Sequence, residues 1–210
     1  MAEDERQLRK RIGRRAANKI INRRKIITTA KGMIEEGGVM SLSPARVAEE
    51  ADVGHGTFYS YFADSEALIE AVIDEAKRDL FQLVGKSVVA SDGFSEALRN
   101  IVSAAVSYAG QHPKLYQLAI QNTLFLSDRF SRQVNVRMEV SAQIVNLLER
   151  YVPDDNEEAY EELVGLANKV ALLLPAARPG SLWDAQGVLE QALHYLSRDI
   201  ADAESWASGS

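Results

Sequence analysis

Apolar residues recur through most of this 210-residue chain at intervals of three and four, a spacing that places them on one face of an α-helix. No stretch alternates apolar and polar residues in the way that a half-buried β-strand requires. Glycine, proline and capping residues separate the apolar runs and mark where helices begin and end. We therefore predict an all-α protein of about nine helices, three in a small N-terminal domain and the others in a larger body.

The first three predicted helices fall within residues 19–65. The first begins near Lys19 and ends at the glycine pair 37–38, because glycine readily terminates a helix. The second covers residues 44–51, where Ser43 can cap the exposed amides and the proline that follows suits the first helical position.

Residues 52–62 follow the second helix across a tight turn and contain a third, short helix. Apolar residues in both helices are spaced so that the helices pack against each other; they are Val47, Ala51, Phe58 and Phe62. This packing turns a small polar and aromatic surface outward, made of Gly56, Thr57, Tyr59, Ser60 and Tyr61. Such an arrangement is typical of a helix-turn-helix whose second helix lies in a groove of DNA.

Residues 66–203 are predicted to form the helical body, and residues 204–210 a tail. The last two helices of the body, residues 159–174 and 182–203, are apolar over more than one face. Two such helices can form a four-helix bundle with those of a second copy, which predicts a homodimer. The alternative is that they complete the core of a monomer. The residues expected at the dimer interface are Leu166, Val170, Leu173, Leu189, Ala192 and Leu196.

Charge is distributed unevenly along the chain. Residues 1–25 hold 10 Lys and Arg against 3 Asp and Glu, whereas residues 66–210 hold 12 against 21. We interpret residues 1–18 as a basic arm that is mobile until it meets a polyanion, with Arg14 and Arg15 expected to reach the DNA backbone or minor groove. The alternative is a tail that only aids solubility.

Residues that would support catalysis or metal binding are scarce. The chain has no cysteine, and its three histidines lie on different predicted elements without metal-ligand spacing. No phosphate-binding loop, dinucleotide fingerprint or nucleophile elbow occurs. We therefore expect no enzyme activity, no metal and no cofactor. No apolar run reaches the roughly 18 residues of a membrane span, so we expect a cytoplasmic protein without a membrane partner.

Aromatic and apolar side chains of the middle helices are candidates for an effector pocket, although residues of this kind are more often part of the core. Such a lining favours a small apolar or amphipathic effector. The candidate residues are Phe81, Tyr108, His112, Tyr116, Phe125 and Met138.

A set of motifs across about residues 20–70 resembles the tetracycline-repressor (TetR) family of bacterial regulators. They are Ile26–Ile27, Ala30, Gly37–Gly38, Leu42–Ser43, Val47–Ala48, Ala51, Val53, Gly56–Thr57–Phe58–Tyr59, Tyr61–Phe62 and Glu66–Ala67–Leu68. The resemblance implies a homodimer that binds palindromic double-stranded operator DNA through an N-terminal helix-turn-helix domain. It also implies a C-terminal ligand-binding and dimerisation domain, in which a small-molecule effector loosens the grip on DNA.

The resemblance also implies individual DNA contacts. Residues in the positions that hold phosphates are Thr57, Tyr59 and Tyr61, and those in the positions that read base edges are His55, Gly56 and Ser60. Ser43 and Arg46 fall at the start of the helix that crosses the backbone. The chain departs from many relatives in having Ser65 in place of a lysine and Tyr61 in place of a histidine.

Two alternatives to an effector-released repressor remain open at this point. One is a DNA-binding activator, or a regulator whose signal is a protein partner. The other is a helical module that binds a small molecule or a protein and whose helix-turn-helix is only structural.

Overall fold

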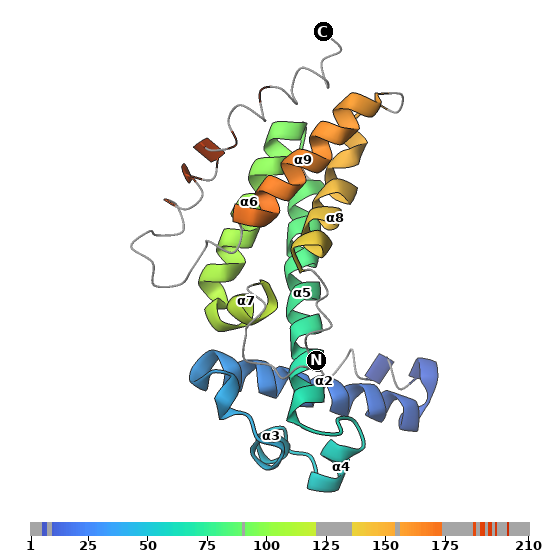
Figure 1. The fold of residues 1–210 in the computed structure, drawn as a ribbon. Helices are drawn as coiled ribbons and strands as arrows, with labels where there is room; N and C mark the ends of the chain where they lie inside the picture. The colour runs from blue at the N-terminus through green and yellow to red at the C-terminus, as the bar shows by residue number, and fades with distance from the viewer. Residues whose placement is uncertain are drawn as a thin grey trace. The chain divides into compact units, whose positions relative to one another are not determined.

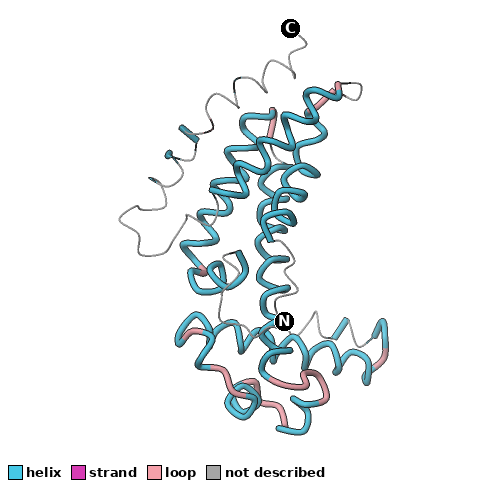
Figure 2. Tube along the Cα trace, viewed as in Figure 1, coloured by secondary structure: helices cyan, strands magenta, loops and turns pink. Residues whose placement is uncertain are grey.

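The computed structural model describes residues 6–7, 10–89, 91–120, 136–153 and 156–173, together with residues 187, 190, 191, 193, 194, 196 and 201. Every regular element in this part of the chain is a helix, which confirms the all-α prediction (Figures 1 and 2). The chain divides into two compact units, residues 1–75 and 76–210.

Unit 1 contains α2 (Arg14–Gly37), the 3-10 helix η1 (Val39–Ser41), α3 (Pro44–Glu50), α4 (His55–Tyr59) and the first part of α5 (Ser65–Val89). The sequence predicts a domain boundary after residue 65, whereas residues 66–75 cluster with unit 1. Apolar burial explains this, because Leu68, Ile69 and Val72 are all at most 6% exposed.

The start of α2 differs from the prediction. The helix begins at Arg14, directly after Gly13 with φ 82°, and not near Lys19. Arginine and alanine are good helix formers, so the helix extends beyond its regular apolar face. Arg14 and Arg15 therefore lie in the first turn of α2 rather than in an arm. The buried residues at this end are Ala17 and Ile21, whereas Ile20 is 44% exposed.

Two predicted helix boundaries in unit 1, the end of α2 and the start of α3, are confirmed by their caps, and α5 begins with a similar cap. Gly38, with φ 78°, donates its amide to the carbonyl of Ile34 at 2.8 Å and ends α2. The hydroxyl of Ser43 accepts the amide of Arg46 at 3.3 Å at the start of α3. The carboxylate of Asp64 accepts the amide of Ala67 at 2.8 Å at the start of α5. Each of these hydrogen bonds joins residues three or four positions apart, so the residue types that form it can be recognised in the sequence.

The packing of α3 against α4 is also confirmed. Val47, Ala51, Phe58 and Phe62 are between 0% and 5% exposed. The rings of Phe58 and Phe62 lie 5.8 Å apart, and the guanidinium of Arg23 lies 5.5 Å from the Phe62 ring. The short α4 is therefore held by a buried aromatic cluster rather than by its own length.

Unit 2 contains the rest of α5, α6 (Phe94–Gln111), α7 (Pro113–Ile120), α8 (Val136–Leu148), the 3-10 helix η2 (Glu149–Tyr151) and α9 (Glu157–Leu173). Helix α6 contributes ten buried side chains. Helices α8 and α9 pack closely side by side, as Figure 1 shows. Tyr108 on α6 donates its hydroxyl to the carbonyl of Ala76 on α5 at 3.2 Å.

Candidate nucleic-acid interface

A tight turn positions α4 after α3. Asp52 adopts φ 51°, a left-handed conformation that aspartate tolerates better than most residues. The amide of Val53 donates to the carbonyl of Ala48 at 3.0 Å. The carbonyl of Gly54 then accepts the amides of Thr57 and Phe58 at 2.8 and 3.1 Å and starts α4. The direction of α4 is therefore set by backbone bonds on both sides of the turn.

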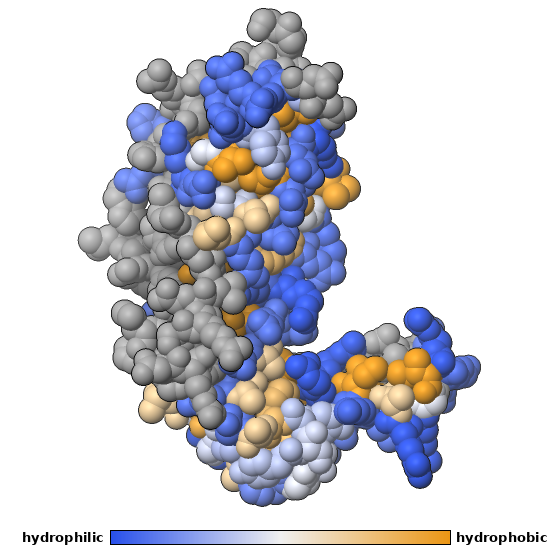
Figure 3. Space-filling view, turned by 45° about the vertical axis from the view of Figure 1, so that its right-hand side comes forward, coloured by the Kyte–Doolittle hydropathy of each residue, from blue (hydrophilic) through white to orange (hydrophobic). Residues whose placement is uncertain are grey.

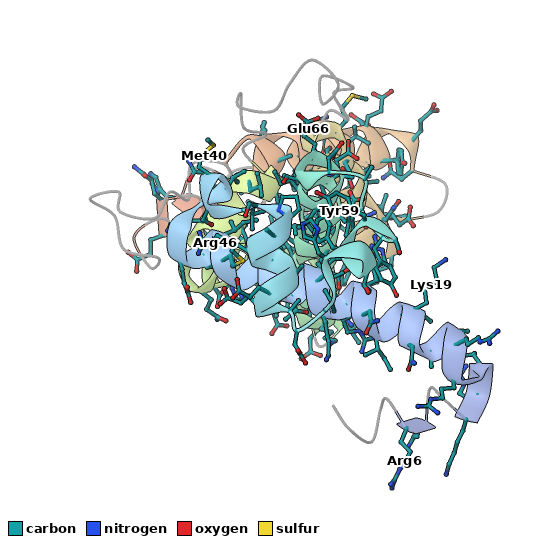
Figure 4. All side chains as sticks on the ribbon, turned by 90° about the horizontal axis from the view of Figure 1, so that it is seen from below. Arg6, Lys19, Met40, Arg46, Tyr59 and Glu66 are labelled. Atoms are coloured by element: carbon teal, nitrogen blue, oxygen red, sulfur yellow. The ribbon has the colours of Figure 1, made fainter. Side chains whose placement is uncertain are left out.

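The two faces of α4 differ sharply in exposure. Phe58 is fully buried, whereas Tyr59 is 49% exposed and the remaining outward residues are exposed or half-buried. All six positions predicted on this helix and just after it lie on one short stretch: His55, Gly56, Thr57, Tyr59, Ser60 and Tyr61. Seen from the side of α3 and α4, Tyr59 and Arg46 lie on these two neighbouring helices (Figure 4).

The orientation of Tyr59 is held by its neighbours. Its ring meets the ring of His55 edge-on at 5.1 Å and the ring of Phe58 at 5.4 Å. Because one of these neighbours is a core residue, the exposed tyrosine loses little further side-chain freedom on binding a partner.

The hydroxyl of Ser60 is engaged within the helix. It donates to the carbonyl of Gly56 at 3.0 Å. A serine hydroxyl can both donate and accept; in Ser60 the hydrogen is used within the helix, and the oxygen is left as an acceptor. Such an oxygen suits an amino group of adenine or cytosine in the major groove better than a carbonyl of guanine or thymine.

Side chains at the start of α3 retain donors that a phosphate can use. Arg46 donates one guanidinium N–H to the carbonyl of Ser41 at 3.2 Å, and this group carries five N–H donors. Ser43 accepts a bond as the helix cap, which leaves its hydroxyl hydrogen to donate. Ser41 itself closes the preceding helix by donating to the carbonyls of Met33 and Gly38 at 3.0 and 2.7 Å.

The first turn of α2 is electropositive. It holds the exposed Arg14 and Arg15, it contains no acidic residue, and no side chain caps its amides. Positive charge at a helix N-terminus opposes the helix dipole, so an anion placed there would be stabilising. Hydrophilic residues dominate this part of the surface around a small apolar patch (Figure 3).

Sequence reasoning missed that the basic residues continue along α2. Arg15, Lys19 and Arg23 are exposed and lie four residues apart, which puts them on one face of the helix. The four-residue spacing was visible in the sequence, and a helix start at Arg14 would have revealed it.

Unit 2 contains a small apolar cavity of about 20 Å³ between α5, α6 and α8. That is room for about one water molecule, far less than a typical ligand pocket. Its lining residues are Leu80, Phe81, Val84, Ile101, Ala105, Val140, Gln143, Ile144 and Leu147.

The candidate effector residues are distributed differently from the prediction. Phe81 borders the cavity, but Met138 is 63% exposed on the outer side of α8 and is not a pocket residue. Tyr108, His112 and Tyr116 form a separate ring cluster on α6 and α7. Within it Tyr108 and Tyr116 are core residues, and burial raises the pKa of the Tyr116 hydroxyl above its ordinary value. Phe125 lies outside the described residues.

Three of the expected dimer-interface residues are corrected by their burial. Leu166, Val170 and Leu196 are at most 2% exposed within a single chain. Helix α9 packs its apolar face against α8, so Leu166 and Val170 are core residues with no surface left for a partner, and Leu196 is fully buried in the same chain. The side chains of Leu173, Leu189 and Ala192 lie outside the described part of the structure.

Within the described residues, no group of three or more His, Cys, Asp or Glu side chains could hold a metal ion. None of the helices described is both long and apolar enough to span a bilayer.

The fold of unit 1 and the exposed face of α4 define a helix-turn-helix DNA-binding protein. Comparisons with known proteins agree: residues 26–72 match the family model described as bacterial regulatory proteins, tetR family. Nucleoid occlusion factor SlmA of Pasteurella multocida (strain Pm70) is 25% identical over 157 residues, covering 71% of this chain and 77% of that protein.

Solved structures of similar fold include SCO4454, a TetR-family transcriptional regulator from Streptomyces coelicolor. It is 22% identical with a TM-score of 0.61, covering 87% of this chain and 96% of that one. The fatty acid degradation regulator FadR from Bacillus halodurans is 17% identical with a TM-score of 0.59, covering 83% of this chain and 93% of that one. The match of residues 26–72 to the tetR family confirms the resemblance drawn from the motifs and supports a DNA-binding regulator of that family.

Proposed function

We propose that this protein is a homodimeric repressor that binds a palindromic operator through α4 and is released by a small apolar or amphipathic effector bound in unit 2. The observation that carries the proposal is the two-sided character of α4. Phe58 is fully buried beneath it, while Tyr59 and the neighbouring polar residues are presented to solvent.

The side chains of α4 favour only modest discrimination between base pairs. Gly56 allows the backbone to approach a base edge closely, His55 offers a ring nitrogen, and Ser60 offers an oxygen acceptor. No arginine lies on α4, so bidentate recognition of guanine is not expected from this helix. Specificity at each base pair is accordingly modest.

Phosphate contacts supply much of the proposed affinity. Thr57, Tyr59 and Tyr61 provide hydroxyls beside the base-reading residues, and Ser43 and Arg46 provide donors at the start of α3. The first turn of α2, with Arg14 and Arg15, adds positive charge where a further phosphate would be favourable.

A homodimer matches this use of α4, because one five-residue helix covers few base pairs. Two copies read half-sites about 34–36 Å apart on one face of the duplex. We place the contact between copies in the C-terminal part of unit 2, where Leu173, Leu189 and Ala192 remain the proposed interface residues. An effector that favours another spacing of the two α4 helices would release the operator.

The proposal is tested on a duplex selected by the protein from a random pool, with binding measured by mobility shift. Tyr59→Phe and Ser60→Ala should each weaken specific binding. The loss should be about tenfold where a hydrogen bond to a DNA phosphate is removed. Tyr160→Phe is the matched control, since Tyr160 is 46% exposed on α9 and should bind as the wild type. Unchanged affinity in both α4 variants would contradict the proposed interface.

A second candidate is carried by the similarity to a relative named as a nucleoid occlusion factor. A genome-wide map of bound sites separates the two roles. A few sites beside promoters would support the repressor, whereas many sites spread along the chromosome without effect on nearby transcription would support the second role.

A further inference from the structure

Helices α5 and α8 run parallel in a constant register. Lys77 pairs with Glu139, Gly85 faces Leu147, and the carbonyl of Val88 accepts a bond from Arg150, and in each pair the two residues are 62 positions apart. At a rise of about 1.5 Å per residue, the paired stretch of α5 is roughly 17 Å long. Figure 1 shows the two helices side by side.

The apolar cavity lies within this paired stretch, and α6 closes its third side. Phe81 and Leu147 on its border are half-buried, and Gln143 is exposed, so the cavity adjoins the surface of unit 2. Enlarging it requires these partly exposed side chains to move and α8 to separate slightly from α5.

An ion pair lies one helical turn from residues that line the cavity. The ammonium nitrogen of Lys77 lies 2.8 Å from a carboxylate oxygen of Glu139. Lys77 precedes Phe81 by one helical turn on α5, and Glu139 precedes Gln143 by one turn on α8. The ion pair and the apolar lining therefore lie one turn apart on the same two helices.

The two charges differ in their surroundings. The side chain of Lys77 is 10% exposed, whereas that of Glu139 is 33% exposed. A buried ammonium requires a counter-charge, because its desolvation is costly when it is left alone. The glutamate, in contrast, can turn toward water without that penalty. A second carboxylate could therefore replace Glu139 as the partner of the Lys77 ammonium group.

We propose that the cavity accepts the apolar chain of a carboxylic acid whose carboxylate replaces Glu139 on Lys77. The chain of the acid occupies the space between α5 and α8 as they separate, and its carboxylate keeps Lys77 paired. This inference rests on the proposed effector site and specifies the chemical class of its ligand.

Replacement of Glu139 by the carboxylate of a ligand would also remove a contact between α5 and α8. Lys77 is the second residue of unit 2, and α5 continues into it from unit 1. With Glu139 on Lys77, α5 is tied to α8 at this point; with a ligand carboxylate there, the tie is lost. A ligand of this class therefore has a differential interaction with two arrangements of α5, which regulation requires.

The test compares octanoate with 1-octanol, which differ in charge but share an apolar chain, by calorimetry on the full-length protein. Wild type should bind octanoate about tenfold more tightly than 1-octanol, as expected for a charge-assisted bond. Lys77→Met should abolish this preference while still binding the alcohol. Glu139→Gln should bind octanoate more tightly than the wild type, because the competing carboxylate is gone.

Lys86→Met is the matched control, since Lys86 is exposed on the same helix and lies five residues, about one and a half turns, beyond Phe81. It should keep the wild-type preference, and circular dichroism should show all variants folded. Equal binding of acid and alcohol by the wild type, no binding of either, or an acid preference that survives Lys77→Met would overturn the proposal.

Operator binding is measured in the same samples. If octanoate binds at Lys77 but leaves operator affinity unchanged, the site stands and its role as the effector site fails. If the protein without octanoate does not bind the operator, the proposed repressor function is wrong, whatever the result for the acid site.

Discussion

Replacing Gly56 with alanine separates the folding of α4 from its proposed contact with DNA. An added Cβ at this position meets no protein atom within 4 Å, and the backbone is not left-handed there. The fold should therefore accept alanine, and the better helix propensity of alanine favours the variant by up to about 1 kcal/mol. For a chain of this size that corresponds to a rise in Tm of at most roughly 2–4 °C.

In the complex with DNA, the added methyl group of Gly56→Ala should be unfavourable rather than favourable. If the backbone of α4 lies against a base edge, the added methyl group must push the helix away or displace a contact. A disrupted base-pair contact costs about 1–3 kcal/mol, which is a loss of roughly 5- to 150-fold in affinity for each half-site. The loss should be largest for the selected operator and small for random DNA, because phosphate contacts remain.

Gly32→Ala provides the control. Gly32 lies on α2 and, like Gly56, has open space where a Cβ would be added. This variant should gain stability of the same order, with unchanged operator binding. Thermal denaturation and fluorescence anisotropy on the selected duplex measure the two effects. Equal operator affinity of Gly56→Ala and wild type would refute the close approach of α4 to DNA, and a lower Tm would refute the local geometry.

Three further predictions follow from the structure. Phe58→Ala removes a fully buried ring and should lower the free energy of unfolding by about 3–5 kcal/mol in chemical denaturation, with loss of operator binding; a smaller change would show that α4 does not depend on this ring. Arg15→Ala should reduce the slope of log affinity against log salt by about 0.9 if one phosphate contact is lost, whereas Arg99→Ala, exposed in unit 2, should leave the slope unchanged. Burial raises the pKa of Tyr116, so the unfolded chain loses this proton first as pH rises; stability should fall above about pH 10, and Tyr116→Phe should reduce that fall in thermal denaturation between pH 8 and 11.

Much of unit 1 followed from the sequence because its signals are local. The cap at Ser43, the glycine that ends α2 and the tight turn after α3 each involve residues within about four positions of one another. The apolar spacing around Phe58 likewise identified both the buried and the outward face of α4.

Errors arose where two local signals compete. The start of α2 was placed too late because the apolar pattern fades before Lys19, although helix propensity carries the helix back to Arg14. The hydroxyl of Ser60 can bond either a base or its own backbone, and because the helix brings the carbonyl of Gly56 within reach, the hydrogen is used there.

The partners of apolar and charged side chains in unit 2 were decided by tertiary structure. An apolar residue at helical spacing must be covered, but the spacing does not say whether its own chain or a second copy covers it. Leu166 and Val170 were assigned to a partner and are buried in the same chain. The pairing of Lys77 with Glu139 spans 62 positions and depends on the parallel register of α5 and α8. Sequence spacing thus determined which faces are buried, because helix geometry is local, and only packing determined what lies against them.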